Sequence, residues 1–184
     1  MPLSPSVSRK QIHTREIKCI GYERDDGLWD IEGRITDTKS YSFDNDDRGL
    51  VGSGTAVHDM LVRLTIDENL IVHRAEACTE ASPFNICPSI ASSVEMLKGL
   101  KITSGWRESV RNKIGGISGC THITQLLIGP VATTAYQTII PIKNTRKKSK
   151  KPARRPAIID TCYSWSAKGP IVKRLWPEYH EGTG

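Results

Sequence analysis

The chain has 184 residues, enough for one domain that buries roughly two thirds of its unfolded surface without disulfide bonds. No apolar run approaches the roughly 20 residues that cross a bilayer, so we expect no membrane span. Five cysteines, an odd number, and the lack of a secretory leader predict a cytoplasmic protein with reduced thiols.

The net charge of +6 comes from one short run. Residues 146–155 carry seven positive charges, and the rest of the chain is nearly neutral. No aromatic platform or recognisable binding module accompanies the run. We therefore interpret residues 144–156 as a solvated basic loop rather than a site for nucleic acid or a membrane surface.

The first predicted element is an antiparallel hairpin over residues 16–41. Asp26-Gly27 is a good tight-turn dipeptide between two segments in which apolar and polar residues alternate. If Trp29 and Ile31 point to the core, then Asp30, Glu32 and Arg34 share the opposite face. These polar residues form either a charge-balanced wet surface or the wall of a polar pocket. Residues 42–56, rich in Asp, Gly and Ser, are expected to form an irregular loop.

The central predicted element is a second hairpin, within residues 57–90. Val62, Leu64 and Ile66 fall on one side of an extended chain and alternate with Leu61, Arg63 and Thr65. Asp67–Asn69 is the expected turn. The hairpin begins at His58-Asp59, and the segment ends with Cys87 before Pro88, a good first residue for a helix.

Helical periodicity follows the second hairpin. It predicts helices over residues 88–98 and 104–114, and a long helix that begins beside Cys120 and kinks at Gly129-Pro130. Residues 157–177 are expected to form a closing hairpin.

The pattern predicts an α+β fold, in which an antiparallel sheet of about four to six strands is packed on one side by about three helices. We expect a single domain over residues 1–184. Its core is expected over 56–140, flanked by the hairpins at 16–41 and 157–177.

Two cysteines at helix starts and a His-Asp pair at a strand start suggest a metal site. Helix N-termini favour thiolates, and zinc or iron accepts thiolate, imidazole and carboxylate ligands. We therefore predict a mononuclear zinc or iron centre held by His58, Asp59, Cys87 and Cys120. His122 is expected in an outer position, and Asp30 and Glu32 are candidates for a pocket wall.

Three functions stay open at this level. With an open coordination position the chain would be a metalloenzyme acting on a small carbonyl or carboxylate compound. Alternatively, Cys87 or Cys120 is the nucleophile of a metal-free enzyme, with His58 or His122 as base and Asp59 orienting the imidazole. The third alternative is a non-catalytic interaction protein that uses the basic loop. The sequence does not fix the oligomeric state.

Several segments resemble a bacterial family known only as domain-of-unknown-function family 2889. The resemblance rests on GYERDDGLWDIEGRITDTK, VHDMLVRLTID, the cysteine before Pro88 and GCTHITQLL, and it covers nearly the whole chain. The family carries no activity that could be transferred.

A remote resemblance links residues 56–138 to iron–sulfur cluster scaffolds of the NifU and SufE type. The order of parts is similar, and the resemblance implies that Asp59, Cys87 and Cys120 occupy ligand positions. The chain has Val57-His58 where those scaffolds have a cysteine before the aspartate. An imidazole in that position favours a mononuclear zinc or iron site over a labile cluster.

Overall fold

The computed structural model describes residues 3–146 and 155–182. The chain divides into two compact units, Met1–Lys143 and Asn144–Gly184, and the candidate site lies in the first. Among the described helices, none has both the length and the apolar character needed to span a membrane.

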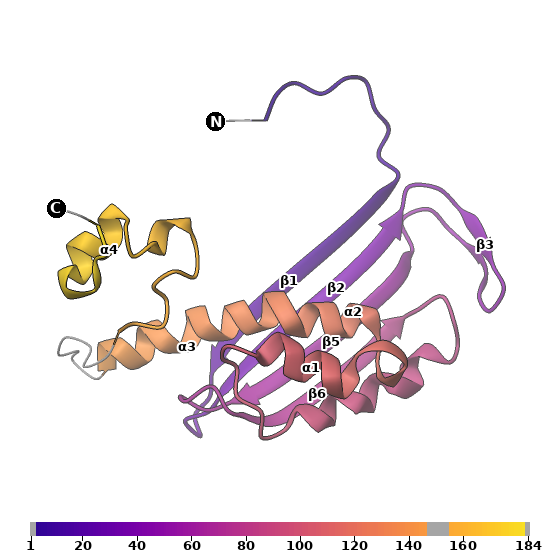
Figure 1. The fold of residues 1–184 in the computed structure, drawn as a ribbon. Helices are drawn as coiled ribbons and strands as arrows, with labels where there is room; N and C mark the ends of the chain where they lie inside the picture. Colours follow the sequence, from indigo (N-terminus) through magenta and orange to yellow (C-terminus); the bar gives the residue numbers. More distant parts are fainter. Residues whose placement is uncertain (1–2, 147–154, 183–184) are drawn as a thin grey trace. The chain divides into compact units, whose positions relative to one another are not determined.

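The first unit is built on a four-stranded antiparallel sheet (Figure 1). Its strands lie in the order β1 (His13–Glu23), β2 (Trp29–Lys39), β5 (Ala56–Ile66) and β6 (Val72–Ala81). The α+β class and the antiparallel sheet are thus confirmed, and two of the three predicted hairpins are present, as β1–β2 and β5–β6.

The connection between β2 and β5 differs from the expectation. Part of residues 42–56 forms a small second hairpin, β3 (Phe43–Asn45) and β4 (Gly49–Val51), instead of an irregular loop. Gly49 has a φ of +66°, a left-handed conformation that glycine adopts without strain, and this allows the tight return.

The alternation of β2 and β5 decides which side chains enter the core. Trp29, Ile31 and Ile35 of β2 are buried on one face, as are Met60, Val62, Leu64 and Ile66 of β5. This is the predicted period of two, and it assigns every later residue of each strand to one face or the other.

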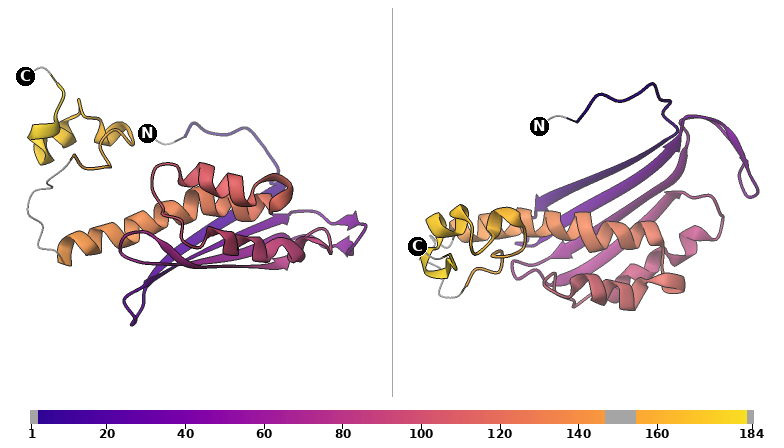
Figure 2. Two further views of the ribbon diagram at one scale, coloured as in Figure 1. Left: turned by 60° about the horizontal axis from the view of Figure 1, so that its bottom comes forward. Right: turned by 45° about the horizontal axis from the view of Figure 1, so that its top comes forward.

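The helical segments lie near the predicted positions. They are η1 (Cys87–Leu97, a 3-10 helix), α1 (Trp106–Ile114), η2 (Gly116–Ser118), α2 (Thr121–Leu126), η3 (Leu127–Val131, a π-helical turn) and α3 (Ala132–Arg146). The helices of the first unit lie on one face of its sheet (Figure 2). The kink expected at Gly129-Pro130 takes the form of the π-helical turn η3, which accommodates a proline that has no N–H to donate.

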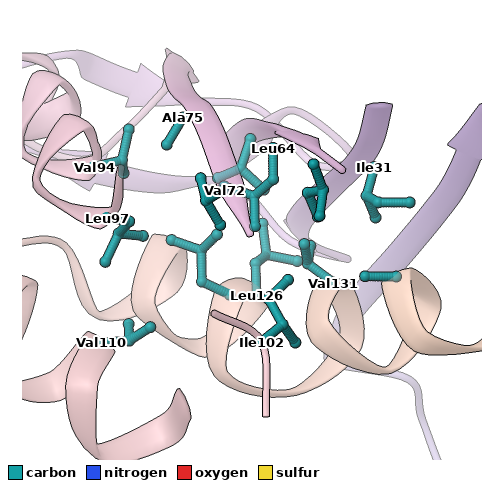
Figure 3. Close-up of a cluster of buried hydrophobic side chains, with 14 of the residues drawn as sticks. Ile31, Leu64, Val72, Ala75, Val94, Leu97, Ile102, Val110, Leu126 and Val131 are labelled. Atoms are coloured by element: carbon teal, nitrogen blue, oxygen red, sulfur yellow. The ribbon is translucent and has the colours of Figure 1, made fainter. Parts of the chain in front are cut away.

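The core of the first unit fills the space between the sheet and the helices. Figure 3 shows side chains of β2, β5 and β6 packed against those of the helices. Trp106 is 4% exposed, and its indole Nε1 donates a hydrogen bond of 2.8 Å to the carbonyl of Leu127. This bond satisfies the one polar group that a buried tryptophan brings into the core.

The second unit contains short helices where a hairpin was expected over residues 157–177. They are η4 (Tyr163–Trp165), α4 (Pro170–Leu175) and η5 (Pro177–Tyr179). A proline opens α4 and another opens η5, positions where its missing N–H costs nothing. Ile159, Ala167 and Val172 form a small core. Most of the basic loop, residues 147–154, lies outside the described part of the chain.

A glycine in β2 allows the helical layer to approach the sheet. A Cβ added at Gly33 would lie 2.6 Å from Cγ2 of Val131, whereas one added at Gly129 would meet nothing within 4 Å. We expect Gly33→Ala to lower the free energy of unfolding by about 1–3 kcal/mol through overpacking. Gly129→Ala is the matched control and should not destabilise the protein. Chemical denaturation measures both, and equal effects would contradict the close approach.

Candidate metal centre

A row of three polar side chains crosses the sheet on its core face. Asp37 of β2 lies opposite Arg15 of β1 on one side and opposite His58 of β5 on the other. The side chain of Asp37 is only 1% exposed, so its carboxylate needs partners within the protein. Its two cross-strand neighbours provide them.

Four donors surround the Asp37 carboxylate. Arg15 donates from Nε to Oδ1 and from Nη2 to Oδ2, each at 2.7 Å, in the two-pronged geometry typical of a strong guanidinium–carboxylate pair. His13 Nε2 lies 3.2 Å from Oδ1, and His58 Nδ1 lies 3.1 Å from Oδ2. Nη1 of Arg15 donates to Gln125 Oε1 at 2.9 Å, which fixes the guanidinium.

A second imidazole reaches the same oxygen from the helical layer. His122, in the first turn of α2, places its Nε2 3.5 Å from Oδ2 of Asp37. The His58 and His122 rings lie with their centroids 3.9 Å apart. The ligand atoms of Asp37, His58 and His122 all lie within 4.8 Å of one another. The structure thus contains a possible metal site of one carboxylate and two imidazoles.

The count of lone pairs explains why this arrangement is unusual. A carboxylate offers about four lone-pair positions. Arg15 occupies one on each oxygen, and His13 takes the second position on Oδ1. The remaining position, on Oδ2, faces both His58 and His122. One lone pair cannot accept two good hydrogen bonds, but one ion could bind this oxygen and both nitrogens.

The electrostatics of the site favour metal-binding protonation states. The hydrogen bonds and charge of Arg15 outweigh burial and lower the pKa of Asp37 to about 2, so it is ionised. Burial is the largest influence on both histidines and lowers the pKa of His58 and of His122. Both imidazoles are therefore neutral at pH 7, and neutral imidazole is the form that binds metals.

The two distances to the carboxylate oxygen also fit an ion. Ligand atoms that each lie roughly 2.0–2.2 Å from a metal are roughly 3.0–3.5 Å from one another. The Nδ1 of His58 and the Nε2 of His122 lie 3.1 and 3.5 Å from Asp37 Oδ2. Coordination would spread the stacked rings, because the rings of two ligands diverge from a shared ion.

The structure does not bring together the four ligands expected from the sequence. His58 belongs to the group of three, but Asp59, the next residue in β5, points to the opposite face of the sheet. There its carboxylate pairs with the guanidinium of Arg34 and lies 3.4 Å from the hydroxyl of Thr36. Adjacent residues in a strand cannot reach one ion on one face, so Asp59 is replaced by Asp37 in this group.

Neither predicted cysteine ligand joins the group among the described residues. Cys87 is the first residue of η1. Cys120 is the N-cap residue of α2, as expected, but its Sγ lies 3.9 Å from Nδ1 of His122. This nitrogen is on the side of the imidazole ring away from Asp37, so Cys120 is a neighbour of a potential ligand. His122, expected in an outer position, is a member of the group itself.

Asp30 and Glu32 lie on the open face of the sheet, across from the candidate site. Asp30 accepts hydrogen bonds from Arg24 and Thr65, and Glu32 accepts two from Arg63. These contacts pair the charges of this face, and Glu32 also lines a cavity of about 470 Å³ there with Lys18 and Arg34.

The alternation of side chains along β2 could have identified Asp37, which the sequence analysis did not select. Asp37 continues the series of Trp29, Ile31, Gly33 and Ile35 along the core face of β2. An aspartate at a core position of such a strand is itself a signal, because a buried charge requires partners. No comparable pattern marks Arg15, because its role depends on the register of β1.

The fold and the site define an α+β protein with a possible Asp-His-His metal centre. Residues 13–137 match the family described as "Protein of unknown function (DUF2889)", and the chain belongs to this family. The match includes every residue of the site but ends before the second unit, so it is shorter than the resemblance suggested. No curated protein and no solved structure matches the chain significantly.

The low pKa of Asp37 predicts how acid affects stability. The group titrates near 3.8 in the unfolded chain and near 2 in the fold, so its contribution is complete above about pH 4 and is lost as pH falls toward 2. We expect wild type to lose on the order of 2 kcal/mol more than Asp37→Asn over this range. Urea unfolding with a chelator present measures it. The exposed Asp44→Asn is the control, and a matching slope in Asp37→Asn would contradict the prediction.

Proposed function

We propose that this protein binds one zinc or iron(II) ion through Asp37, His58 and His122. The observation that carries the proposal is the convergence of two imidazole nitrogens on one oxygen of a buried carboxylate. Two histidines and one carboxylate are a ligand set used by both catalytic zinc and non-haem iron.

The surroundings of the three residues support a built site. Arg15 and His13 both contact Oδ1 of Asp37, the oxygen that would not bind the ion. Hydrogen bonds that fix a ligand in this way raise metal affinity. The sulfur of Cys120, 3.9 Å from Nδ1 of His122, can accept a hydrogen bond from Nδ1–H, and this tautomer leaves the lone pair of Nε2 free for the ion.

Three protein ligands leave coordination positions for water or substrate. The side chains of His58 and His122 are 21% and 17% exposed, so solvent reaches the rim of the site. A bound ion would act there as a Lewis acid, and a small carbonyl or carboxylate compound is the proposed substrate class. We do not propose cluster assembly, because iron–sulfur clusters are held by several thiolates and this group contains none.

Metal analysis tests the proposal directly. Purified wild type, reloaded with zinc or with iron(II) under anaerobic conditions, should retain about one ion per chain. His58→Ala and His122→Ala should each lower metal affinity by about tenfold or more, because each removes one of three ligands. Calorimetric titration with each metal measures the change.

His73→Ala is the matched control. His73, an exposed residue of β6, pairs with Asp67 at 3.2 Å, so its removal deletes the same kind of pair outside the site. It should leave metal binding unchanged. If wild type, both site variants and the control bind the metal with equal affinity, the proposed ligand set is wrong.

One observation favours a second candidate function, a metal-free thiol enzyme. The Sγ of Cys120 lies 3.9 Å from His122 Nδ1, and Nε2 of the same ring lies 3.5 Å from Asp37. A cysteine, an imidazole and an orienting carboxylate in this order are the parts of a nucleophilic site. In this candidate, Asp37 takes the orienting role first expected for Asp59.

Alkylation separates the two candidates. A Cys120 nucleophile should react with iodoacetamide faster than Cys162, an exposed cysteine of the second unit, and His122→Ala should abolish the difference. Peptide mass spectrometry after timed labelling measures both rates. Slow labelling of Cys120 in metal-free protein would count against the thiol enzyme and would leave the metal proposal untouched.

A further inference from the structure

Strand β1 forms a long edge of the sheet. Within the described residues of the first unit, β1 pairs with β2 and has no other strand beside it. It runs for 11 residues without a register shift and without proline. Ile17 is 39% exposed and Tyr22 is 44% exposed. A regular edge of this length can accept another strand, because one row of its backbone N–H and C=O groups faces outward.

We propose that two copies of this chain pair through antiparallel β1 strands and join their sheets into one. The occupant of the edge is a second copy because the charges of β1 are complementary to themselves. Glu16 and Lys18 flank Ile17 and share the open face of the sheet. In the pairing centred on Ile17, Glu16 lies opposite the partner's Lys18, and the symmetry makes this ion pair twice.

Symmetry limits the other registers. A two-fold axis perpendicular to the sheet leaves the core faces of both copies on the same side of the joined sheet. An odd-numbered residue can therefore pair only with an odd-numbered residue of the partner, and an even-numbered one only with an even-numbered one. Centring the pairing on Lys18 places it opposite the partner's Lys18, and centring it on Glu16 places two carboxylates together. Like charges directly opposite are unfavourable. Within β1, a pairing centred on Ile20 forms no ion pair, because Lys18 faces the partner's Tyr22 and Ile17 faces the partner's Glu23.

A pairing centred on Cys19 is then the remaining competitor. It would set Arg15 opposite the partner's Glu23, but the Arg15 guanidinium already donates to Asp37 and Gln125. It also leaves Lys18 facing the partner's Ile20. This register therefore lacks the two ion pairs between Glu16 and Lys18 that the pairing centred on Ile17 forms. The observed contacts therefore favour the pairing centred on Ile17, where the two Ile17 side chains also meet.

Charge exchange tests the interface without damaging the monomer. Within the monomer, Lys18 lies opposite Arg34 and Glu16 lies opposite Thr36, so the exchanged side chains keep acceptable neighbours. By analytical ultracentrifugation we expect wild type to have twice the 20.4 kDa of the chain. Lys18→Glu and Glu16→Lys should each weaken dimerisation by about tenfold or more, because both ion pairs become repulsive.

The double exchange Glu16→Lys with Lys18→Glu should restore the dimer, which loss of folding in a single variant could not mimic. Circular dichroism of each variant confirms the fold. A wild type that stays monomeric throughout the micromolar range overturns the proposal. So does a double variant no better than either single one.

Cross-linking fixes the register. In a background with Cys19, Cys78 and Cys162 changed to Ser, Ile17→Cys should form an intermolecular disulfide when copper phenanthroline and dioxygen remove two electrons and two protons from the paired thiols. The same background with Cys19 kept and Ile17 unchanged is the control. Cross-linking through Cys19 but not through position 17 would overturn the register.

Discussion

The ionised carboxylate of Asp37, held inside the protein, is the constraint on which the rest of the site depends. A charge that is only 1% exposed cannot rely on water, and here a guanidinium and imidazoles replace the solvent. The partners come from different elements: Arg15 from β1, His58 from β5 and His122 from α2. The carboxylate therefore links the strands to the helical layer where β2 ends.

The packing of the helices on the sheet delivers His122 to this point. Gly33 of β2 has no side chain where Val131 approaches, and Gly21 of β1 lies in the same way beneath Thr138. The helical run from Thr121 to Lys143 can therefore lie close to the strands, with its first turn over Asp37. Close approach in the core and the position of one imidazole are two results of the same packing.

The family match and the proposed centre concern the same part of the molecule. Residues 13–137 contain Arg15, Asp37, His58 and His122, whereas the second unit, with its own small core, lies outside the match. An edge strand that carries Arg15 also offers the proposed dimer interface, so β1 serves both proposals. Every residue of the proposed centre and of the proposed interface therefore belongs to the first unit.

The sequence by itself determined the α+β class, both long hairpins, the position of the three main helical segments and the inward faces of β2 and β5. These features are local, because alternation, turn dipeptides and helix signals act over a few residues. It also pointed to His58 and to the helix start at Cys120, but it failed where short β-strands or proline-led helical turns replaced a loop and a hairpin. Only the tertiary structure decided that Asp37 belongs with His58, and Asp59 with Arg34. That choice depends on the register between strands and on where the helix starts above them, and no single segment encodes either.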